Sequence, residues 1–385
     1  MKLEISDAIK YIGVDDKTID LFESQYVVPN GISYNSYVIL DEKVCVMDTV
    51  DRRKTDEWLS NLEKTLGERT PDYLVISHLE PDHAANIKLL SENYPAMKLV
   101  GNAKTFSTLP QFFDVDLENR TVVVKEGDSL SLGEHTLFFY MAPMVHWPEV
   151  MVSYESKEKI LFSADGFGKF GALDTDEDWS CEARRYYFNI CGKYGAQVQS
   201  LLKKAASLDI KTICPLHGPV LKENLGYYIN LYDIWSKYEP ETDGIFVAYA
   251  SIHGNTEKAA LKLVDILKSK IDKKIVFADL ARTDMAENIE DAFKYPTLVV
   301  AAPTYDGGIF PVVNDFLHHL KIKGYRNRKV AIIENGSWAP MAGKIMTSYF
   351  EEMKNIEISD KKVTIRSAMT AENEKELEDL AESLI

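Results

Sequence analysis

Residues 244–385 alternate two kinds of segment, and this alternation constrains the fold more than any other feature of the chain. Five short runs rich in β-branched residues are separated by stretches with amphipathic helical periodicity, and these runs are IFVAYA, KIVFADL, TLVVAA, KVAIIEN and KVTIRSA. Strands that alternate with helices in this way form a parallel sheet with helices on both faces. We therefore predict a doubly wound parallel sheet with five strands and about five helices.

Residues 1–243 follow a different pattern. Paired β-runs are joined by turns, as in SYNSYVIL with VCVMDTV, and helical stretches lie near residues 54–66, 84–93 and 181–206. This pattern predicts hairpin sheets covered by helices, an αββα-like sandwich. The segment LYDIWSKYEPETDG loses apolar periodicity just before the next strand. We place the domain boundary there, giving domains 1–243 and 244–385, and a chain of 385 residues is long enough for two cores.

Composition excludes several classes of protein. The net charge is −16 and no run of Lys and Arg offsets it, which argues against a nucleic-acid partner. No apolar run has the form of a signal peptide or the length of a membrane span, so the sequence predicts a cytoplasmic protein with no membrane contact. The four cysteines form no CxxC pair, which argues against a disulfide framework or a fused iron–sulfur or rubredoxin-type module, and they are Cys45, Cys181, Cys191 and Cys214.

Four potential metal ligands crowd one loop after the apolar run YLVIS, in the sequence His78-Leu-Glu80-Pro-Asp82-His83. Alternate residues of an extended loop point the same way, so His78, Glu80 and Asp82 are expected to converge while His83 opens toward a neighbouring position. That arrangement suits two metals better than one. The alternative is a solvated loop in which Asp82 caps the following helix.

Three more candidate ligands follow apolar runs: His146 after LFFYMAPMV, Asp165 after KILFSA and His217 after IKTICPL. Each lies where a strand would deliver a loop residue to a shared edge. The sequence therefore predicts that these residues join the four in the first loop.

Other histidines and aromatics carry weaker signals. His135 and the pair His318-His319 have no acidic cluster beside them, so we expect ordinary surface or packed histidines. Trp147 and Tyr26 are candidates to line a substrate pocket, although large aromatics more often serve packing.

The first strand of the C-terminal domain runs into a loop that could bind a phosphate, Ser251-Ile-His253-Gly254-Asn255-Thr256, and then into a helix. Small residues expose backbone N–H groups at a helix N-terminus, where the helix dipole also favours an anion. Neither GxGxxG nor GxxxxGK[ST] occurs there, which weakens dinucleotide and nucleoside-triphosphate interpretations. The alternative is an ordinary strand-to-helix turn with an N-cap.

Two further loops follow adjacent strands of the same sheet. They are Pro303-Thr304-Tyr305-Asp306-Gly307 and Asn335-Gly336-Ser337-Trp338. Ligands of open α/β sheets bind at the carboxyl edge of the strands. Glycines allow backbone to approach a flat ring closely, and Tyr305 or Trp338 could stack on it.

Taken in order, these motifs resemble those of the flavodiiron proteins, whose N-terminal domain has the metallo-β-lactamase-like fold. The resemblance rests on the four-ligand loop and on its spacing, since 62 residues (84–145) precede His146 and a further 18 (147–164) precede Asp165. The three C-terminal loops resemble the FMN loops of flavodoxin. Nearly the whole chain is covered, with the domains in the family's order.

The resemblance implies an oxidoreductase that reduces O₂ to water, NO to N₂O, or both. It implies two Fe ions, one held by His78, Glu80 and His146, the other by Asp82, His83 and His217, with Asp165 bridging. FMN would pass electrons from an external donor, most simply rubredoxin, because no CxxC module is fused; a reduced deazaflavin coenzyme is the alternative. The resemblance also implies a head-to-tail homodimer or a dimer of such dimers.

Two other functions compete with this one. The first is a zinc hydrolase with a flavodoxin-like appendage, but zinc hydrolases of this fold carry His where this chain has Glu80, and a harder carboxylate ligand favours iron. The second is an electron carrier with a vestigial metal site. Only 51 residues (166–216) separate Asp165 from His217, fewer than is usual in the family, so we expect a trimmed loop between Gly166 and Trp179 and an altered site mouth.

Overall fold

The computed structural model describes residues 5–385 as two compact units. One unit contains residues 5–187 and Ala196–Asp233, and the other contains Phe188–Gly195 and Ile234–Ile385. The predicted domain boundary at residue 243 stays a prediction. Among the residues described, none of the helices is both long and apolar enough to cross a membrane.

The first unit is built on two sheets. One has the strand order β1 (Ile9–Tyr11), β6 (Tyr37–Leu40), β7 (Val44–Met47), β8 (Tyr73–Val75), β9 (Lys98–Gly101) and β10 (Thr121–Val123). The other has the order β11 (Ser129–Ser131), β12 (Thr136–Met141), β13 (Met151–Glu155), β14 (Ile160–Phe162) and β15 (Thr212–Cys214). Two small pairs complete the unit: β2 (Val14–Asp16) with β5 (Ile32–Tyr34), and β3 (Leu21–Phe22) with β4 (Tyr26–Val27).

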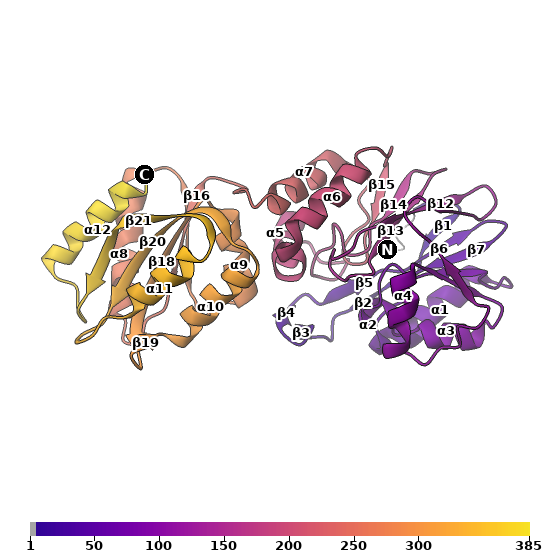
Figure 1. Ribbon diagram of the computed structural model, residues 1–385, viewed down its shortest axis with the longest axis horizontal. Coiled ribbons are helices and arrows are strands. Elements are labelled where there is room, and N and C mark those ends of the chain that lie inside the picture. Colours follow the sequence, from indigo (N-terminus) through magenta and orange to yellow (C-terminus); the bar gives the residue numbers. More distant parts are fainter. Residues whose placement is uncertain (1–4) are drawn as a thin grey trace. The chain divides into compact units, whose positions relative to one another are not determined.

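The inner faces of the two sheets share one apolar core. Tyr37, Ile39 and Met47 from the first sheet join Phe139 and Met151 from the second in a single buried cluster. Figure 1 shows helices outside both sheets: α1 (Thr55–Leu66), α3 (Ile87–Asn93) and α4 (Ala103–Thr108) beside the first, and α5 (Trp179–Tyr186), α6 (Gly195–Ala205) and α7 (Leu225–Ser236) beside the second. The predicted αββα sandwich is thus confirmed.

Helix boundaries differ from the sequence prediction in two places. The helix expected near residues 84–93 begins only at Ile87, as α3, after a break that follows α2 (Pro81–Ala84). Residues 181–206, expected to form one helix, contain a break: α5 ends at Tyr186, and π and 3-10 turns over residues 187–194 precede α6. The break coincides with Gly192 and Gly195, which destabilise helix interiors. A side chain at position 195 would also lie only 2.3 Å from the Ser236 carbonyl oxygen.

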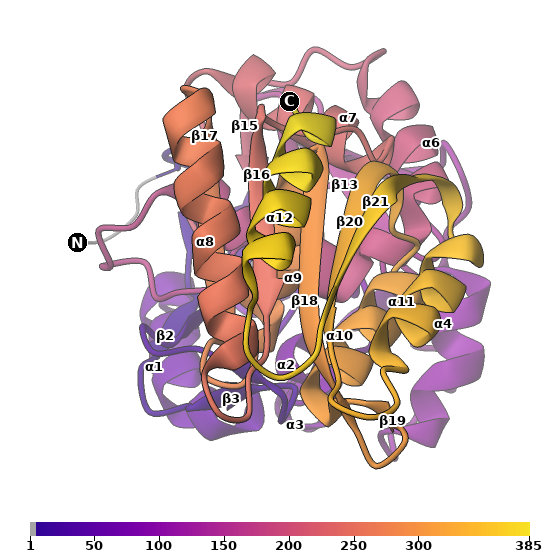
Figure 2. The same ribbon diagram turned by 90° about the vertical axis from the view of Figure 1, so that its left-hand side faces the viewer.

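The second unit is the predicted parallel sheet, with the order β17 (Lys274–Asp279), β16 (Gly244–Tyr249), β18 (Thr297–Tyr305), β20 (Arg326–Asn335) and β21 (Lys354–Ile365). Short β19 (Gly308–Ile309) pairs with β18. Figure 2 shows α8 (Asn255–Lys270) and α12 (Ala371–Ser383) side by side on one face of the sheet. The remaining helices are α9 (Met285–Lys294), α10 (Pro311–Ile322) and α11 (Ala342–Glu351). The doubly wound fold class is confirmed.

His135 is not an ordinary surface histidine, because two acidic residues from distant turns flank it. It lies in the β11–β12 turn, with Asp41 Oδ2 of the β6–β7 turn 2.6 Å from its Nδ1 and Glu158 Oε1 of the β13–β14 turn 3.2 Å from its Nε2. Burial alone would lower the pKa of His135, but the hydrogen bonds to these carboxylates outweigh it and raise the pKa. One imidazole therefore ties three turns together.

We predict that His135→Gln destabilises the first unit in a pH-dependent way, by about 1–3 kcal/mol at most. Because the pKa of His135 is higher in the folded chain than in the unfolded chain, the charged imidazole stabilises the fold fully below about pH 6.5, the pKa in the unfolded chain. This stabilisation is lost as the pH rises through the pKa of His135 in the folded chain. Melting temperatures at pH 5.5 and 9 should show the larger difference from wild type at pH 5.5. His318→Gln, at an exposed position, is the control; an equal difference at both pH values would contradict the prediction.

Candidate functional site

The seven predicted ligands of the first unit come together where strands of both sheets end. His78 follows β8, Asp165 follows β14 and His217 follows β15, while His146 lies in the β12–β13 connection. Two groups form within 4.8 Å: His78, Glu80, His146 and Asp165 in one, and Asp82, His83 and His217 in the other. The grouping of the ligands matches the one that the resemblance implied, and metal binding by these residues stays a prediction.

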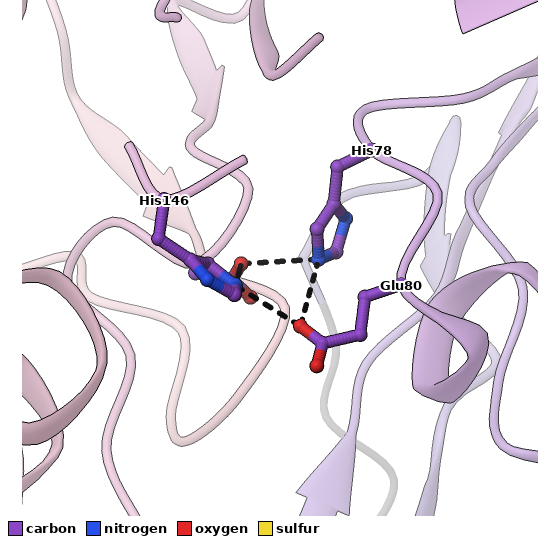
Figure 3. Close-up of side chains that lie close together, drawn as sticks. His78, Glu80 and His146 are labelled. Carbon is purple, nitrogen blue, oxygen red and sulfur yellow. Dashed lines mark ion pairs between the residues drawn. The ribbon is translucent and has the colours of Figure 1, made fainter. Parts of the chain in front are cut away.

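The first group has two imidazoles and two carboxylates facing one another. Figure 3 shows His78 and Glu80 from one loop pointing toward His146 from another. The Nε2 atom of His146 lies 3.0 Å from Glu80 Oε2 and 3.1 Å from Asp165 Oδ2. His78 Nε2 is likewise 3.1 Å from Asp165 Oδ2 and 3.8 Å from Glu80 Oε2.

The second group is separated from the first because the ligand loop is not extended throughout. Helix α2 (Pro81–Ala84) begins directly after Glu80, so Asp82 and His83 lie in a helical turn and not in an extended loop. The expectation that Asp82 converges with His78 and Glu80 is therefore wrong. Asp82 Oδ2 lies 3.2 Å from His217 Nε2, and the Nε2 atoms of His83 and His217 are also 3.2 Å apart.

Asp165 connects the two groups. Its Oδ2 faces the first group, and its Oδ1 lies 3.7 Å from His217 Nε2 in the second. Both oxygens are buried and neither has a hydrogen-bond partner among the described residues. The carboxylate is thus placed to serve both groups at once.

The donor atoms fit metal ions. Two ligand atoms, each about 2.1 Å from one ion and at right angles, lie about 3.0 Å apart, close to the separations within each group. Both ring nitrogens of His78, His146 Nε2 and both oxygens of Asp82 are buried without hydrogen-bond partners among the described residues. Burying such atoms unpaired is costly unless a cation compensates them. These residues therefore suit a pair of metal ions.

The pKa values show how strongly the groups interact. Burial alone would raise the pKa of Asp165, but the imidazoles of His78 and His146 hold it well below its usual range. Burial and the Glu80 carboxylate raise the pKa of Asp82 to about 6. Burial and the His217 imidazole hold the pKa of His83 well below its usual value, which favours the neutral form that binds a metal.

Neighbouring groups fix the orientation of the second group. His217 Nδ1 lies 2.7 Å from the Ser33 carbonyl oxygen, so Nδ1 donates there and leaves Nε2 free to bind a metal. The ring of Tyr34 stands edge-on to both His83 and His217. Its hydroxyl accepts a 2.9 Å hydrogen bond from Arg53, whose guanidinium also bonds Asp51. Sequence patterns did not single out Tyr34, because it meets His83 and His217 only in the folded chain.

A cavity of about 630 Å³ opens onto the ligands. Glu80 and Asp82 line it together with the β3–β4 turn residue Glu23, whose pKa is raised to about 7 by burial and by the Glu80 carboxylate. Neither Trp147 nor Tyr26 belongs to its lining. Trp147 stands edge-on to His78 and His146 and Tyr26 lies against Phe170, so both serve packing.

The three predicted loops of the second unit meet around a cavity of about 480 Å³, at the carboxyl ends of β16, β18 and β20. All the predicted residues line this cavity except Gly254, and Ile252, Ala339 and Ser367 line it as well. Gly254 has a φ of +82° and precedes α8, where it presents the backbone of the loop at the helix N-terminus. Ser367, which sequence reasoning missed, exchanges hydrogen bonds with Asn335.

This cavity suits a ligand that carries a phosphate and a flat ring. Its volume falls within the roughly 300–1,000 Å³ typical of small-molecule sites. The N-terminus of α8 offers N–H groups to a phosphate. The Trp338 side chain is 91% exposed at the rim, where a ring could cover it, and Tyr305 is also exposed.

Comparisons with known proteins agree with this geometry. Residues 32–218 match the family model described as ODP family beta lactamase. The chain is 28% identical to the nitric oxide reductase of Moorella thermoacetica, covering 91% of this chain and 90% of the relative, and 26% identical to the rubredoxin-oxygen oxidoreductase of Megalodesulfovibrio gigas, covering 99% and 96%. The crystal structure of the flavodiiron protein from Giardia intestinalis superposes with a TM-score of 0.92 at 26% identity, covering 100% of this chain and 96% of that one.

We predict that Asp165→Ala weakens metal binding by both groups, whereas His217→Ala affects only the second. The reason is that Asp165 faces both groups and His217 belongs to one. Anaerobic titration with ferrous ion, followed by metal analysis, should give two ions per chain for wild type, about one for His217→Ala and fewer than one for Asp165→Ala. Glu63→Gln, an exposed carboxylate of α1 outside both groups, is the control; two tightly held ions in Asp165→Ala would contradict the prediction.

Proposed function

We propose that this chain is a flavodiiron oxidoreductase that reduces O₂ to water, NO to N₂O, or both, at a two-iron site supplied with electrons through FMN. The observation that carries the proposal is the pair of adjoining ligand groups joined by Asp165. Reduction of O₂ or NO at two irons requires two metal positions that lie close together. A carboxylate shared by both ligand groups, that of Asp165, would keep these positions close.

The donor chemistry favours iron over zinc. Each group offers two imidazoles with one or two carboxylates, the ligand set typical of non-haem Fe(II) sites with open positions. No cysteine takes part in either group among the described residues. Glu80 contributes a hard oxygen ligand where the zinc hydrolases of this fold carry histidine, and this further favours iron.

When bound, FMN would supply electrons one at a time, and the two irons would supply the site at which a diatomic gas is reduced. The protein residues hold this site in place. Ser33 fixes His217 with Nε2 toward the second group, and Asp165 presents one oxygen to each group. Phe112 and Phe113 add apolar side chains to the lining of the cavity.

The three loops of the second unit are proposed to hold FMN. Ser251, Asn255 and Thr256 surround its phosphate at the start of α8, with support from the helix dipole. The loops after β18 and β20 flank the isoalloxazine, with Tyr305 and Trp338 as candidate stacking partners.

We propose a rubredoxin-type protein as the electron donor and a head-to-tail homodimer as the working assembly. The printed name of the Megalodesulfovibrio gigas relative supports the donor. Exposed apolar side chains support the assembly, since Leu21 and Phe112 lie at the metal cavity and Ile252, Tyr305 and Trp338 at the flavin cavity. A second copy that brings its flavin cavity against the metal cavity would cover both sets.

We expect Asp82→Ala and His146→Ala to abolish O₂ and NO consumption by the FMN-loaded, donor-reduced protein. Each variant removes one ligand of a two-ion site while leaving the second unit intact. Gas electrodes would measure consumption, and the flavin absorbance should match that of wild type. His318→Ala should consume gas at the wild-type rate. Undiminished consumption in both ligand variants, or wild-type protein that carries zinc and no flavin, would refute the proposed function.

Trp338→Ala tests the flavin cavity separately. Removing an exposed stacking ring should weaken FMN binding by about 3- to 10-fold, in keeping with the roughly 0.5–1.5 kcal/mol of an aromatic contact. FMN fluorescence quenching would measure the affinity, and iron content should not change. Exposed Tyr227 in the first unit offers the matched control, Tyr227→Ala. Equal FMN affinity in wild type and Trp338→Ala would exclude stacking by this residue.

A further inference from the structure

One buried carboxylate outside both ligand groups lies between the two chain segments that build the first group. Glu149 is 1% exposed and follows His146 by three positions. Its Oε1 accepts a 3.0 Å hydrogen bond from the backbone N–H of Leu79, the residue between His78 and Glu80. Its Oε2 is buried and has no hydrogen-bond partner among the described residues.

From this placement we propose that Glu149 is a positioning residue that sets the separation between His146 and the pair His78 and Glu80, and that it thereby controls the iron affinity of the first group. The inference rests on the proposed two-iron function. It concerns the first group, because Leu79 lies between His78 and Glu80 and Glu149 follows His146 by three positions.

The backbone around Glu149 is anchored on both sides. Asn102 caps helix α4 through its Oδ1 and donates from Nδ2 to the Glu149 carbonyl oxygen at 2.6 Å. The N–H of Met151 donates to the Ser77 carbonyl oxygen at 3.0 Å, a second link between the same two segments. The two segments are thus joined both by the Glu149 side chain and by a backbone hydrogen bond. The backbone hydrogen bond would remain in a variant that lacks the Glu149 side chain.

The hydrogen bond from Leu79 to Glu149 lies between His78 and Glu80, where a small movement of the backbone displaces the metal ligands. Leu79 is fully buried, so a displaced N–H could not be compensated by bulk solvent. The donor atoms of the first group lie 3.0–3.8 Å apart, and a movement of the 78–80 loop relative to His146 changes those separations directly. Removal of groups that orient metal ligands typically costs about 10- to 100-fold in metal affinity.

The chain offers a matched control in Glu155. This carboxylate is also fully buried and also accepts backbone N–H groups, from Lys157 at 2.8 Å and Glu158 at 2.7 Å. It is the last residue of β13 and belongs to neither ligand group. A variant at Glu155 therefore reproduces the loss of a buried carboxylate without touching a ligand loop.

The test compares Glu149→Ala, Glu149→Gln and Glu155→Ala in the full chain loaded with ferrous ion. Release of iron to a chelator should show two phases in wild type, and the phase missing from His146→Ala identifies the first group. We expect Glu149→Ala to speed that phase by about 10- to 100-fold and to leave the other unchanged. Glu149→Gln retains an acceptor oxygen for Leu79 and should release iron at nearly the wild-type rate. Melting temperatures of all variants report general destabilisation.

Three results would overturn the inference: wild-type release in Glu149→Ala, equal acceleration of both phases, or the same acceleration in Glu155→Ala. Faster release from Glu149→Gln, equal to that from Glu149→Ala, would also overturn it, because the acceptor would then not be the cause. Wild-type protein that binds no iron would instead contradict the proposed function, so the two failures are distinguishable.

Discussion

The first unit depends on one constraint, which is that seven titratable side chains are buried in two adjoining ligand groups. Four imidazoles and three carboxylates lie within a few ångströms of one another, and Glu80, with 15% of its side chain exposed, is the most accessible of them. Taking such groups out of water is expensive unless they are paired or bind a cation. Divalent ions would satisfy the oxygens of Asp82 and Asp165 and the nitrogen of His146 that lack hydrogen-bond partners. The fold must therefore hold these atoms at fixed separations rather than let the site collapse.

The sandwich architecture achieves this by drawing ligands from strand ends of both sheets. His78 follows β8 of the first sheet, whereas Asp165 and His217 follow β14 and β15 of the second. The two sheets pack on a common core, so the ligand loops are attached to strands that this close-packed core holds in place. The second unit uses the same principle at one edge of a parallel sheet, where three loops meet around the flavin cavity.

Much of this could be predicted because it depends on local patterns. Strand runs and their ends are visible in the sequence, and placing His146, Asp165 and His217 after apolar runs was enough to bring them to one site. Patterns could not show how the ligands divide, since this depends on where α2 begins, at Pro81. They also could not pair His135 with Asp41 or Leu79 with Glu149, because each contact joins positions far apart in the chain. The break at residues 187–194 is of the same kind, since it reflects the close approach of Gly195 to Ser236.

The trimming of the segment between Asp165 and His217 stays a prediction, but the structure shows how its first part is anchored. This part is bonded to the turn between β4 and β5: Gly171 N–H donates to the Gly31 carbonyl at 3.1 Å and Ala172 N–H to that of Asn30 at 2.9 Å. Lys169, almost fully buried, pairs with Glu177 at 3.2 Å and closes the loop on itself. Within the part of the chain that the structure describes, no residue of this loop lines the metal cavity. The cavity is lined by the β3–β4 hairpin and by Phe112 and Phe113 as well as by Glu80 and Asp82, so the approach to the ligands is bounded in part by residues that no ligand motif contains.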